Sequence, residues 1–346
     1  MIHNRSRAIL YALLAAAFYA INVPLSKLLL AYVGETTMAA LLYLGAGIGI
    51  GILSLFNRKD RQRSEKLNRN DLPYVIGMIV LDIAAPILLM LGIRYGTCSS
   101  ASLLGNFEIV ATTVIALLLF QETVSQRLWC AIGLITLASA MLSFEGTDSF
   151  HFSVGSLFVL MASSCWGFEN NFTRKISSKN TYEIVLLKGL FSGLGSLIIS
   201  LIRHEQFPAF GYFVSALLLG FVAYGLSIFL YIRAQYTLGA AKTSAYYAVA
   251  PFIGALLSFL ILRERLTWLY FAALMVMIIG TALVVIDTLK CNHTHLHAHT
   301  FTHTHDGSTH VHVIIHEHAH DHYLNEDRHG HRHTMAELEK GHCHEC

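Results

Sequence analysis

Long apolar stretches, separated by short polar breaks, make up most of the chain. A helix needs roughly 20 apolar residues to cross a hydrocarbon core about 30 Å thick. Ten stretches approach that length, and the connections between them are short apart from the polar run at 57–71. The predicted spans are 8–30, 36–56, 72–93, 98–120, 127–144, 154–176, 182–202, 212–236, 242–262 and 267–287. This pattern predicts an all-α integral membrane protein in which ten transmembrane helices pack as one bundle.

The composition agrees with a membrane protein. Of the 346 residues, 54% are apolar and only 13% are charged, which is not the composition of a soluble domain. The net charge of +2 gives no reason to expect a nucleic-acid partner, and the sequence contains no glycine-rich phosphate loop of the Walker type. We therefore expect a protein that is not an enzyme and requires no cofactor.

Lysine and arginine are distributed unequally between the two sides of the predicted bundle. With the N terminus inside, thirteen of them lie in inner segments and four in outer loops. The inner ones are Arg5, Arg7, Arg58, Lys59, Arg61, Arg63, Lys66, Arg69, Arg127, Arg174, Lys175, Lys179 and Lys242, and the outer ones are Arg94, Arg203, Arg263 and Arg265. Cytoplasmic loops carry the excess of positive charge. We expect a multi-pass protein of the cell (inner) membrane with both termini in the cytoplasm.

The two sets of five spans resemble each other. Short similar segments recur in the same order, at 19–22 and 166–169, at 92–94 and 231–233, and at 120–124 and 262–266. Because each set has an odd number of spans, the second copy would be inserted upside down relative to the first, as in many secondary transporters. The predicted domains are a first repeat at 1–148, an inverted repeat at 149–290 and a tail at 291–346.

Ten spans arranged as five plus five, with a Glu-containing turn before the last span of each half, resemble the EamA-like family of the drug/metabolite transporter superfamily. The turns are Phe120 to Val124 and Leu262 to Leu266, and the resemblance covers roughly residues 8–287. It implies alternating access around a central cavity, and export or exchange of metabolites such as amino acids without ATP. Span four departs from the family pattern, since Asn106 and Glu108 stand in a region that is usually apolar and contains proline.

We single out five ionisable side chains within the predicted spans, where each costs roughly 2.5 to 3.5 kcal/mol to insert. They are Lys27, Asp82, Glu108, Glu169 and Lys188. Glu169 and Lys188 have the same predicted depth, so we expect an ion pair, with either a structural or a gating role.

No cationic neighbour is apparent from the sequence for Asp82 or Glu108. A carboxylate without a partner in a low-dielectric environment favours its protonated form. Glu108 is therefore either a proton or substrate-amine site lining the cavity, or a protonated group hydrogen-bonded within the bundle. For Asp82, near Pro86, we favour the structural role.

Span eight carries a polar stripe at Tyr224, Ser227, Tyr231 and Gln235, whose spacing places them on one helix face. Together with nearby polar residues, the stripe suits a small zwitterionic or aromatic substrate; the alternative is packing between helices. The candidate substrate or coupling residues are Asn22, Asp82, Asn106, Glu108, Glu169, Asn170, Lys188, Tyr224, Ser227, Tyr231, Tyr246 and Tyr247.

Span two contains a face of small residues. Gly47 and Gly51 form a G-x-x-x-G pattern, which allows helix backbones to approach closely. We expect close packing within the bundle, with a dimer contact as the alternative. The protein is accordingly expected to be a monomer or a homodimer.

Histidine is concentrated in the tail, which holds 17 of the chain's 20, many at alternate positions. Imidazole is a good ligand for Zn, Ni, Cu and Co. We expect the tail to bind divalent metal such as Zn or Ni. The predicted ligands are His303, His305, His310, His312, His316, His318, His320 and His322.

Part of the tail also has a hairpin pattern, from Phe301 to Val313. Asp306-Gly307 favours a two-residue type I′ turn, and in that register His303 pairs with His310. His303, His305, His310 and His312 would then share one face of the ribbon, since side chains alternate along a strand. The alternative is a disordered buffering tail, because an isolated hairpin is only marginally stable.

These features predict a secondary active transporter of small polar metabolites such as amino acids, with a metal-binding regulatory tail. Its expected partners are a small-molecule substrate, the lipid bilayer and divalent metal on the tail. The alternative is a divalent transition-metal transporter that uses the tail as a sensor or buffer, although the predicted spans contain no histidine. A passive membrane anchor is disfavoured, because it has no reason to bear the insertion cost of buried charges.

Overall fold

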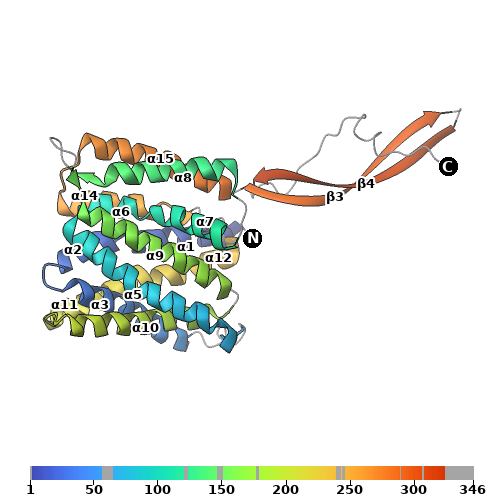
Figure 1. Cartoon of the computed structure of the whole chain (residues 1–346). Helices are drawn as coiled ribbons and strands as arrows, with labels where there is room; N and C mark the ends of the chain where they lie inside the picture. Colours follow the sequence, from blue (N-terminus) through green and yellow to red (C-terminus); the bar gives the residue numbers. More distant parts are fainter. Residues whose placement is uncertain are drawn as a thin grey trace. The chain divides into compact units, whose positions relative to one another are not determined.

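The computed structural model describes residues 2–56, 65–120, 124–145, 151–176, 179–238, 243, 246–288, 290–305 and 308–323. The chain divides into two compact units, Met1–Val285 and Ile286–Cys346. The first is a helical bundle and the second contains a long two-stranded ribbon (Figure 1).

The first half of the bundle contains seven α-helices and one short 3₁₀ helix among its described residues. They are α1 (Ile2–Ala20), α2 (Asn22–Leu29), α3 (Glu35–Phe56), η1 (Arg69–Asp71), α5 (Leu72–Tyr95), α6 (Cys98–Leu104), α7 (Phe107–Phe120) and α8 (Gln126–Leu142). Asn68 caps η1 by accepting a hydrogen bond from the backbone of Asn70. The Ser125 side chain likewise caps α8 by accepting a hydrogen bond from the backbone of Leu128.

The second half follows two short paired strands, β1 (Phe144–Glu145) and β2 (His151–Phe152). Its helices are α9 (Val154–Ile176), α10 (Thr181–Ile202), α11 (Phe210–Gly220), the π-helix η2 (Phe221–Leu226), α12 (Ser227–Leu238), α14 (Ala250–Leu262) and α15 (Trp268–Thr288). Each predicted span overlaps one or more of these helices.

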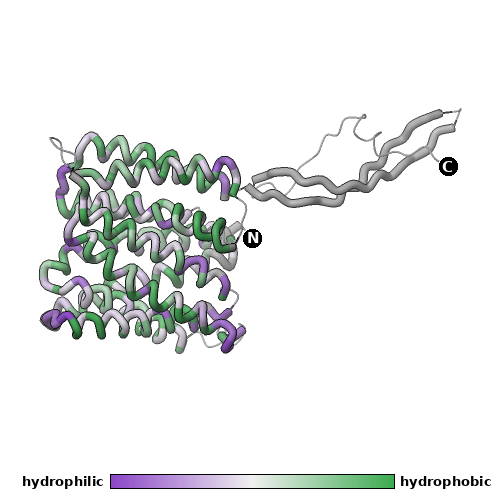
Figure 2. Tube along the Cα trace, in the orientation of Figure 1, coloured by the Kyte–Doolittle hydropathy of each residue, from purple (hydrophilic) through white to green (hydrophobic). Residues whose placement is uncertain are grey.

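Seven segments of the described chain are long and apolar enough to cross a membrane by themselves. They are Ser6–Leu29, Glu35–Phe56, Arg69–Tyr95, Cys98–Leu119, Tyr182–Ile202, Phe210–Tyr231 and Trp268–Asp287. The helices α8 and α14 are apolar but shorter. Along the bundle, hydrophobic residues fill the helices and hydrophilic ones gather towards their ends (Figure 2). The fold is therefore that of a multi-pass membrane protein, and the count of ten spans stays a prediction.

Close packing of α3 against the second half holds the bundle together. The helix contacts α10 along its length and also α11 and η2, while α5 packs on α9 and α1 on α12. At the crossing of α3 and α10, a Cβ atom built on Gly189 would lie only 2.5 Å from the Cα atom of Gly47. The small face of span two thus packs inside the bundle, as predicted.

Four spans are interrupted partway along. The first breaks at Ile21, between α1 and α2, and span four breaks at Gly105 and Asn106, between α6 and α7. Span eight passes through the π-helix η2, and the residues before α14 form a turn at Ala248 and Val249. Interrupted helices expose backbone groups that need other partners, and in membrane carriers they commonly surround a binding site.

In the second unit, β3 (Lys290–His305) pairs with β4 (Ser308–Tyr323) in antiparallel orientation. The register pairs His303 with His310, as the sequence predicts, and also pairs Phe301 with His312. The ribbon is longer than the predicted hairpin, since it extends to the pair Lys290 and Tyr323. The expected turn at 306–307 lies outside the described residues.

Candidate substrate and coupling site

An ammonium group lies between two buried carboxylates where α5, α9 and α10 meet. Lys188 Nζ is 3.0 Å from Glu169 Oε1 and 3.2 Å from Asp82 Oδ2. Asp82 is fully buried and Glu169 is 2% exposed. The predicted pair of Glu169 and Lys188 is therefore present. The expectation that Asp82 has no cationic neighbour is wrong, because α5 packs against both α9 and α10 and brings Asp82 to the same lysine.

Hydrogen bonds extend this charged triad of Asp82, Glu169 and Lys188. The hydroxyl of Tyr43 donates to Asp82 Oδ1 at 3.0 Å, and Trp166 Nε1 donates to the Tyr43 hydroxyl at 3.5 Å. Thr173, one turn along α9, donates to Glu169. With both carboxylates ionised the triad has one negative charge in excess, which a proton or a bound cation would balance.

Glu108 lies in the first turn of α7, directly after the break in span four. Its Oε1 atom accepts a hydrogen bond of 2.6 Å from Asn170 Nδ2, and the same nitrogen lies 3.3 Å from Thr112 Oγ1. Among the residues that the structure describes, no ion pair includes Glu108. A carboxyl group at a helix start, held by an amide rather than a cation, is suited to receive a proton or a cationic ligand.

Tyrosine rings from α1, η2, α12 and the residues before α14 pack into a cluster. The ring centroids of Tyr19 and Tyr224 are 5.8 Å apart, those of Tyr19 and Tyr247 are 6.0 Å apart, and Tyr231 contacts Tyr247 edge to face at 5.2 Å. Glu108 interacts electrostatically with Tyr19, Tyr224 and Tyr247. Tyr43 and Tyr224, with centroids 5.3 Å apart, connect this tyrosine cluster to the charged triad.

Polar groups from the interrupted spans complete the cluster. Asn22 follows the break in span one and donates to the Tyr224 hydroxyl at 3.1 Å. Ser227 donates to the backbone carbonyl of Ala15 at 2.8 Å and lies 3.4 Å from the Tyr247 hydroxyl. Asn106, 3% exposed, has no hydrogen-bond partner for its Nδ2 atom within the described ranges. The breaks in spans one and eight therefore place Asn22 and Ser227 beside the tyrosine cluster.

Most of the candidate residues selected from the sequence come together here. The structure differs from that selection in two respects. Tyr246 is 36% exposed and has no ring contact with the described tyrosines, whereas the adjacent Tyr247 belongs to the cluster. Tyr19, Tyr43 and Trp166 belong to the site although they were not selected. Tyr19 and Trp166 do stand in the recurring segments at 19–22 and 166–169, which was the signal available for them.

Lys27 does not join this site. Its ammonium donates to the carbonyls of Arg94 and Gly96, each at 3.1 Å, and so caps the end of α5. Nearby, Arg94 Nη1 lies 2.8 Å from Glu35 Oε1. We call the side of the bundle formed by the loops at 30–34, 95–97, 203–209 and 263–267 the Arg94 end.

Two glutamates from the second half cap helices of the first half at the Arg94 end. Glu264 accepts hydrogen bonds from the backbone of Cys98 at 2.6 Å and of Ser99 at 2.8 Å, at the start of α6. Glu205 accepts from the backbone of Thr36 at 3.2 Å and of Thr37 at 2.8 Å, at the start of α3. Carboxylates stabilise helix N-termini, so these contacts join the two halves of the bundle at the Arg94 end.

The charge of Glu205 is stabilised by those contacts. Burial by itself raises the pKa of this carboxyl group, but the hydrogen bonds from Thr37 and Thr36 act in the opposite direction. The net result is a pKa below the ordinary value for glutamate.

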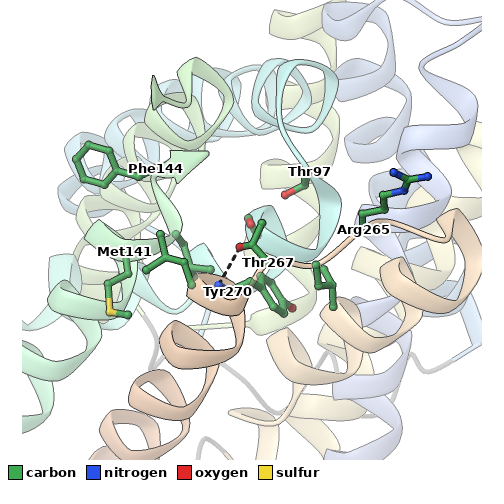
Figure 3. A pocket seen from close by; sticks show the side chains of 10 residues that line it. Thr97, Met141, Phe144, Arg265, Thr267 and Tyr270 are labelled. Atoms are coloured by element: carbon green, nitrogen blue, oxygen red, sulfur yellow. Dashed lines mark hydrogen bonds between the residues drawn. The ribbon is translucent and has the colours of Figure 1, made fainter. Parts of the chain in front are cut away.

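A half-open cavity of about 210 Å³ lies at the same end (Figure 3). Its lining combines hydroxyl groups and one guanidinium with apolar side chains, and includes no member of the charged triad or tyrosine cluster. The lining residues are Thr97, Ser100, Met141, Leu142, Phe144, Arg265, Leu266, Thr267, Leu269 and Tyr270. The Thr267 hydroxyl accepts a hydrogen bond of 3.2 Å from the backbone of Tyr270 and so caps the start of α15.

The chain is similar to other proteins in sequence and in fold. An uncharacterized transporter of Methanothermobacter thermautotrophicus is 26% identical over 270 residues, which cover 72% of this chain and 78% of that protein. A solved structure described as "Crystal structure of protein" has a TM-score of 0.61 at 14% identity, covering 81% of this chain and 96% of that one. At that identity the likeness concerns the fold alone.

A family model matches the chain twice, at residues 6–144 and 153–286, and thus covers nearly all of the helical bundle. The two matched stretches coincide with the two sets of helices described above. On this match, the chain belongs to the EamA-like transporter family.

Proposed function

We propose that the protein is a secondary active transporter of small polar metabolites such as amino acids, acting as an exporter or exchanger by alternating access. The proposal places it in the cell (inner) membrane with both termini in the cytoplasm, as the distribution of Lys and Arg favours. The observation that carries it is the carboxyl group of Glu108, which lies at a helix break, accepts a hydrogen bond from Asn170 and interacts electrostatically with tyrosines of the cluster.

Glu108 is proposed to take either a proton or the amino group of the substrate. Both neutralise the same carboxylate, so their binding is mutually exclusive, and the release of one favours the uptake of the other. Tyr19, Tyr224 and Tyr247 supply aromatic faces that attract a substrate cation. Exchange of a proton for a protonated amine at one site links the proton gradient to metabolite movement.

The charged triad is proposed to stabilise the helices around that site. Lys188 neutralises one of its two carboxylate partners, and Asp82 and Glu169 come from different helices. A substrate carboxylate that approached Lys188 would compete with these partners and loosen the contact between α5, α9 and α10. Such a change in contacts is what alternating access requires.

The closed Arg94 end fits one state of such a cycle. Glu205 and Glu264 hold helix starts there by hydrogen bonds that must break before this end can open. With the proposed orientation, the Arg94 end faces outward, and these hydrogen bonds are proposed to keep the charged triad and the tyrosine cluster closed off from the outside.

The tail is proposed to be a metal-binding regulator that takes Zn or Ni. Its histidines provide the ligands, and its attachment after α15 would connect metal binding to the carrier. In the alternative function, transport of divalent transition metals, the same tail would be a sensor or buffer.

The test is flux in proteoliposomes that contain a mixed pool of metabolites, under an imposed pH gradient. Wild type, Glu108→Gln and a chain truncated after Lys290 are compared with and without Zn. Glu65→Gln is the matched control, because Glu65 is exposed and its ion-pair partner, Lys179, is not part of the site. We expect metabolite flux linked to protons, lost in Glu108→Gln and kept after truncation. Metal flux without metabolite flux, abolished by truncation, would support the alternative.

A further inference from the structure

The register of the ribbon sorts its residues onto two faces. Sixteen consecutive pairs run from Lys290 and Tyr323 to His305 and Ser308. Directly opposed residues lie on the same face of a sheet, and faces alternate along each strand. One face therefore carries Cys291 and twelve histidines, which are His293, His295, His297, His299, His303 and His305 of β3 and His310, His312, His316, His318, His320 and His322 of β4.

The other face carries no histidine along the described strands. Most of its residues are threonine, alanine or larger aliphatic residues, such as Thr294, Leu296, Val311 and Ile315. A slip of one residue in register would move every histidine of one strand to the wrong face. The segregation thus depends on the pairing of β3 with β4 and on the alternation within both strands.

The histidine face contains two groups of opposed pairs. The proximal cluster is the four consecutive pairs Cys291 with His322, His293 with His320, His295 with His318, and His297 with His316. The distal cluster is the pair His303 with His310 and its neighbours His305 and His312. Between the clusters, His299 is opposed by Ile314 and Phe301 by His312, so the row of opposed histidines is interrupted.

The spacing within each cluster suits tetrahedral coordination. Opposed residues have Cβ atoms about 4.5 to 5.5 Å apart, and alternate residues of one strand lie about 6.8 Å apart. Two adjacent pairs therefore provide four ligands around one position, which is the number that Zn²⁺ takes in closed sites. Imidazole and thiolate also favour Zn²⁺, Ni²⁺, Co²⁺ and Cu²⁺ over Mg²⁺ and Ca²⁺.

We infer that the β3–β4 ribbon is a one-faced array of transition-metal sites, in which opposed histidines of the two strands jointly bind each ion. The ligand count allows about two ions in the proximal cluster and one in the distal cluster. The inference rests on the proposed metal-binding tail and goes beyond it, because it makes strand register, rather than histidine content, the determinant of affinity. It also brings His293, His295 and His297 into the site, beyond the ligands that the sequence selected.

Exchanging neighbouring residues tests this directly, because it moves histidines to the other face without changing the composition. The β3 exchange is H293T, T294H, H295L, L296H, H297A and A298H. The β4 exchange is I315H, H316I, E317H, H318E, A319H and H320A. In the register of the ribbon, the double exchange restores three opposed histidine pairs on the opposite face, at 294 with 319, 296 with 317, and 298 with 315.

Zn²⁺ binding is measured by equilibrium dialysis on the full-length protein in nanodiscs, with Mg²⁺ as the competing ion. Each single exchange is expected to weaken binding of the proximal ions on the order of 100-fold, since the histidines of the two strands then lie on opposite faces and cannot bind the same ion together. The double exchange is expected to regain that affinity. Equal binding by all four proteins, or failure of the double exchange to recover, would overturn the inference.

Metabolite flux of the same proteins separates this inference from the proposed function. The exchanges leave residues 1–290 unchanged, so a monodisperse protein with normal flux in the absence of Zn shows that the bundle is folded. Lack of metabolite flux in every variant, wild type included, would refute the carrier function and leave the metal measurement valid. Recovery of Zn affinity in the double exchange would support the ribbon inference whichever substrate the bundle carries.

Discussion

Lys188 on α10 lies 3.2 Å from the fully buried carboxylate of Asp82 on α5, and this contact joins two helices from different halves of the chain. The same ammonium is 3.0 Å from Glu169 on α9. Both carboxylates depend on one cation, so the loss of that cation is expected to have a larger effect than the loss of either acid.

Replacing Lys188 by methionine is expected to destabilise the protein by about 3 to 5 kcal/mol, because two buried carboxylates then lack their counter-ion. Thermal unfolding in detergent measures the effect. Lys66→Met, at an exposed position, is the control and should change little. The double variant Lys188→Met/Asp82→Asn should recover part of the loss; no recovery would mean that Asp82 and Lys188 are not energetically coupled.

Conservative replacement of Glu108 is expected to show whether its carboxyl group couples flux to protons. Glu108→Gln keeps an acceptor for Asn170 but cannot exchange a proton, so flux should become independent of the pH gradient and fall at least about tenfold. Glu108→Asp keeps the carboxyl group and should retain a pH-dependent, weaker flux. Equal pH dependence in wild type and Glu108→Gln would exclude Glu108 as the proton site.

A methyl group at Gly189 is expected to force α3 and α10 apart. The added Cβ would lie 2.5 Å from the Cα atom of Gly47, which is backbone and cannot move aside. Gly189→Ala should therefore cost about 1 to 3 kcal/mol of stability, as overpacking typically does. Gly133→Ala is the matched control, because a Cβ atom there meets nothing within 4 Å. That control should be neutral or slightly stabilising, since alanine is the better helix former.

The stability contributed by Glu205 is expected to depend on pH in one direction. Because the folded protein lowers the pKa of this carboxyl group, its contribution is present above the pKa of the unfolded chain and is lost as pH falls through the lower folded value. Glu205→Gln should thus be less stable than wild type at neutral pH, with the difference shrinking at acidic pH. Thermal unfolding of both proteins between neutral and acidic pH gives this comparison. A constant difference would show that the charge of Glu205 has no part in holding the α3 N-terminus.

The linear pattern of apolar residues was sufficient to predict the helical segments and part of the candidate site. Length and hydropathy placed helices at each predicted span, and equal depth in the bilayer was enough to pair Glu169 with Lys188. The turn signal of Asp306-Gly307 in the sequence was likewise enough to predict the pairing of His303 with His310. In each case the predicted feature is encoded by a short stretch of chain, or it depends only on the depth of the residues along the helix axis.

What only the tertiary structure decided is how each helix is rotated and which neighbours it meets. Asp82 was expected to lack a cation, yet the packing of α5 on α9 and α10 brings it to Lys188. Tyr43 joins Asp82, and Tyr247 rather than Tyr246 joins the cluster, for the same reason. Nearly every face of a membrane helix is apolar, so hydropathy carries little information about rotation. The interhelical contacts that do select it, such as that of Gly47 with Gly189, join residues far apart in the sequence.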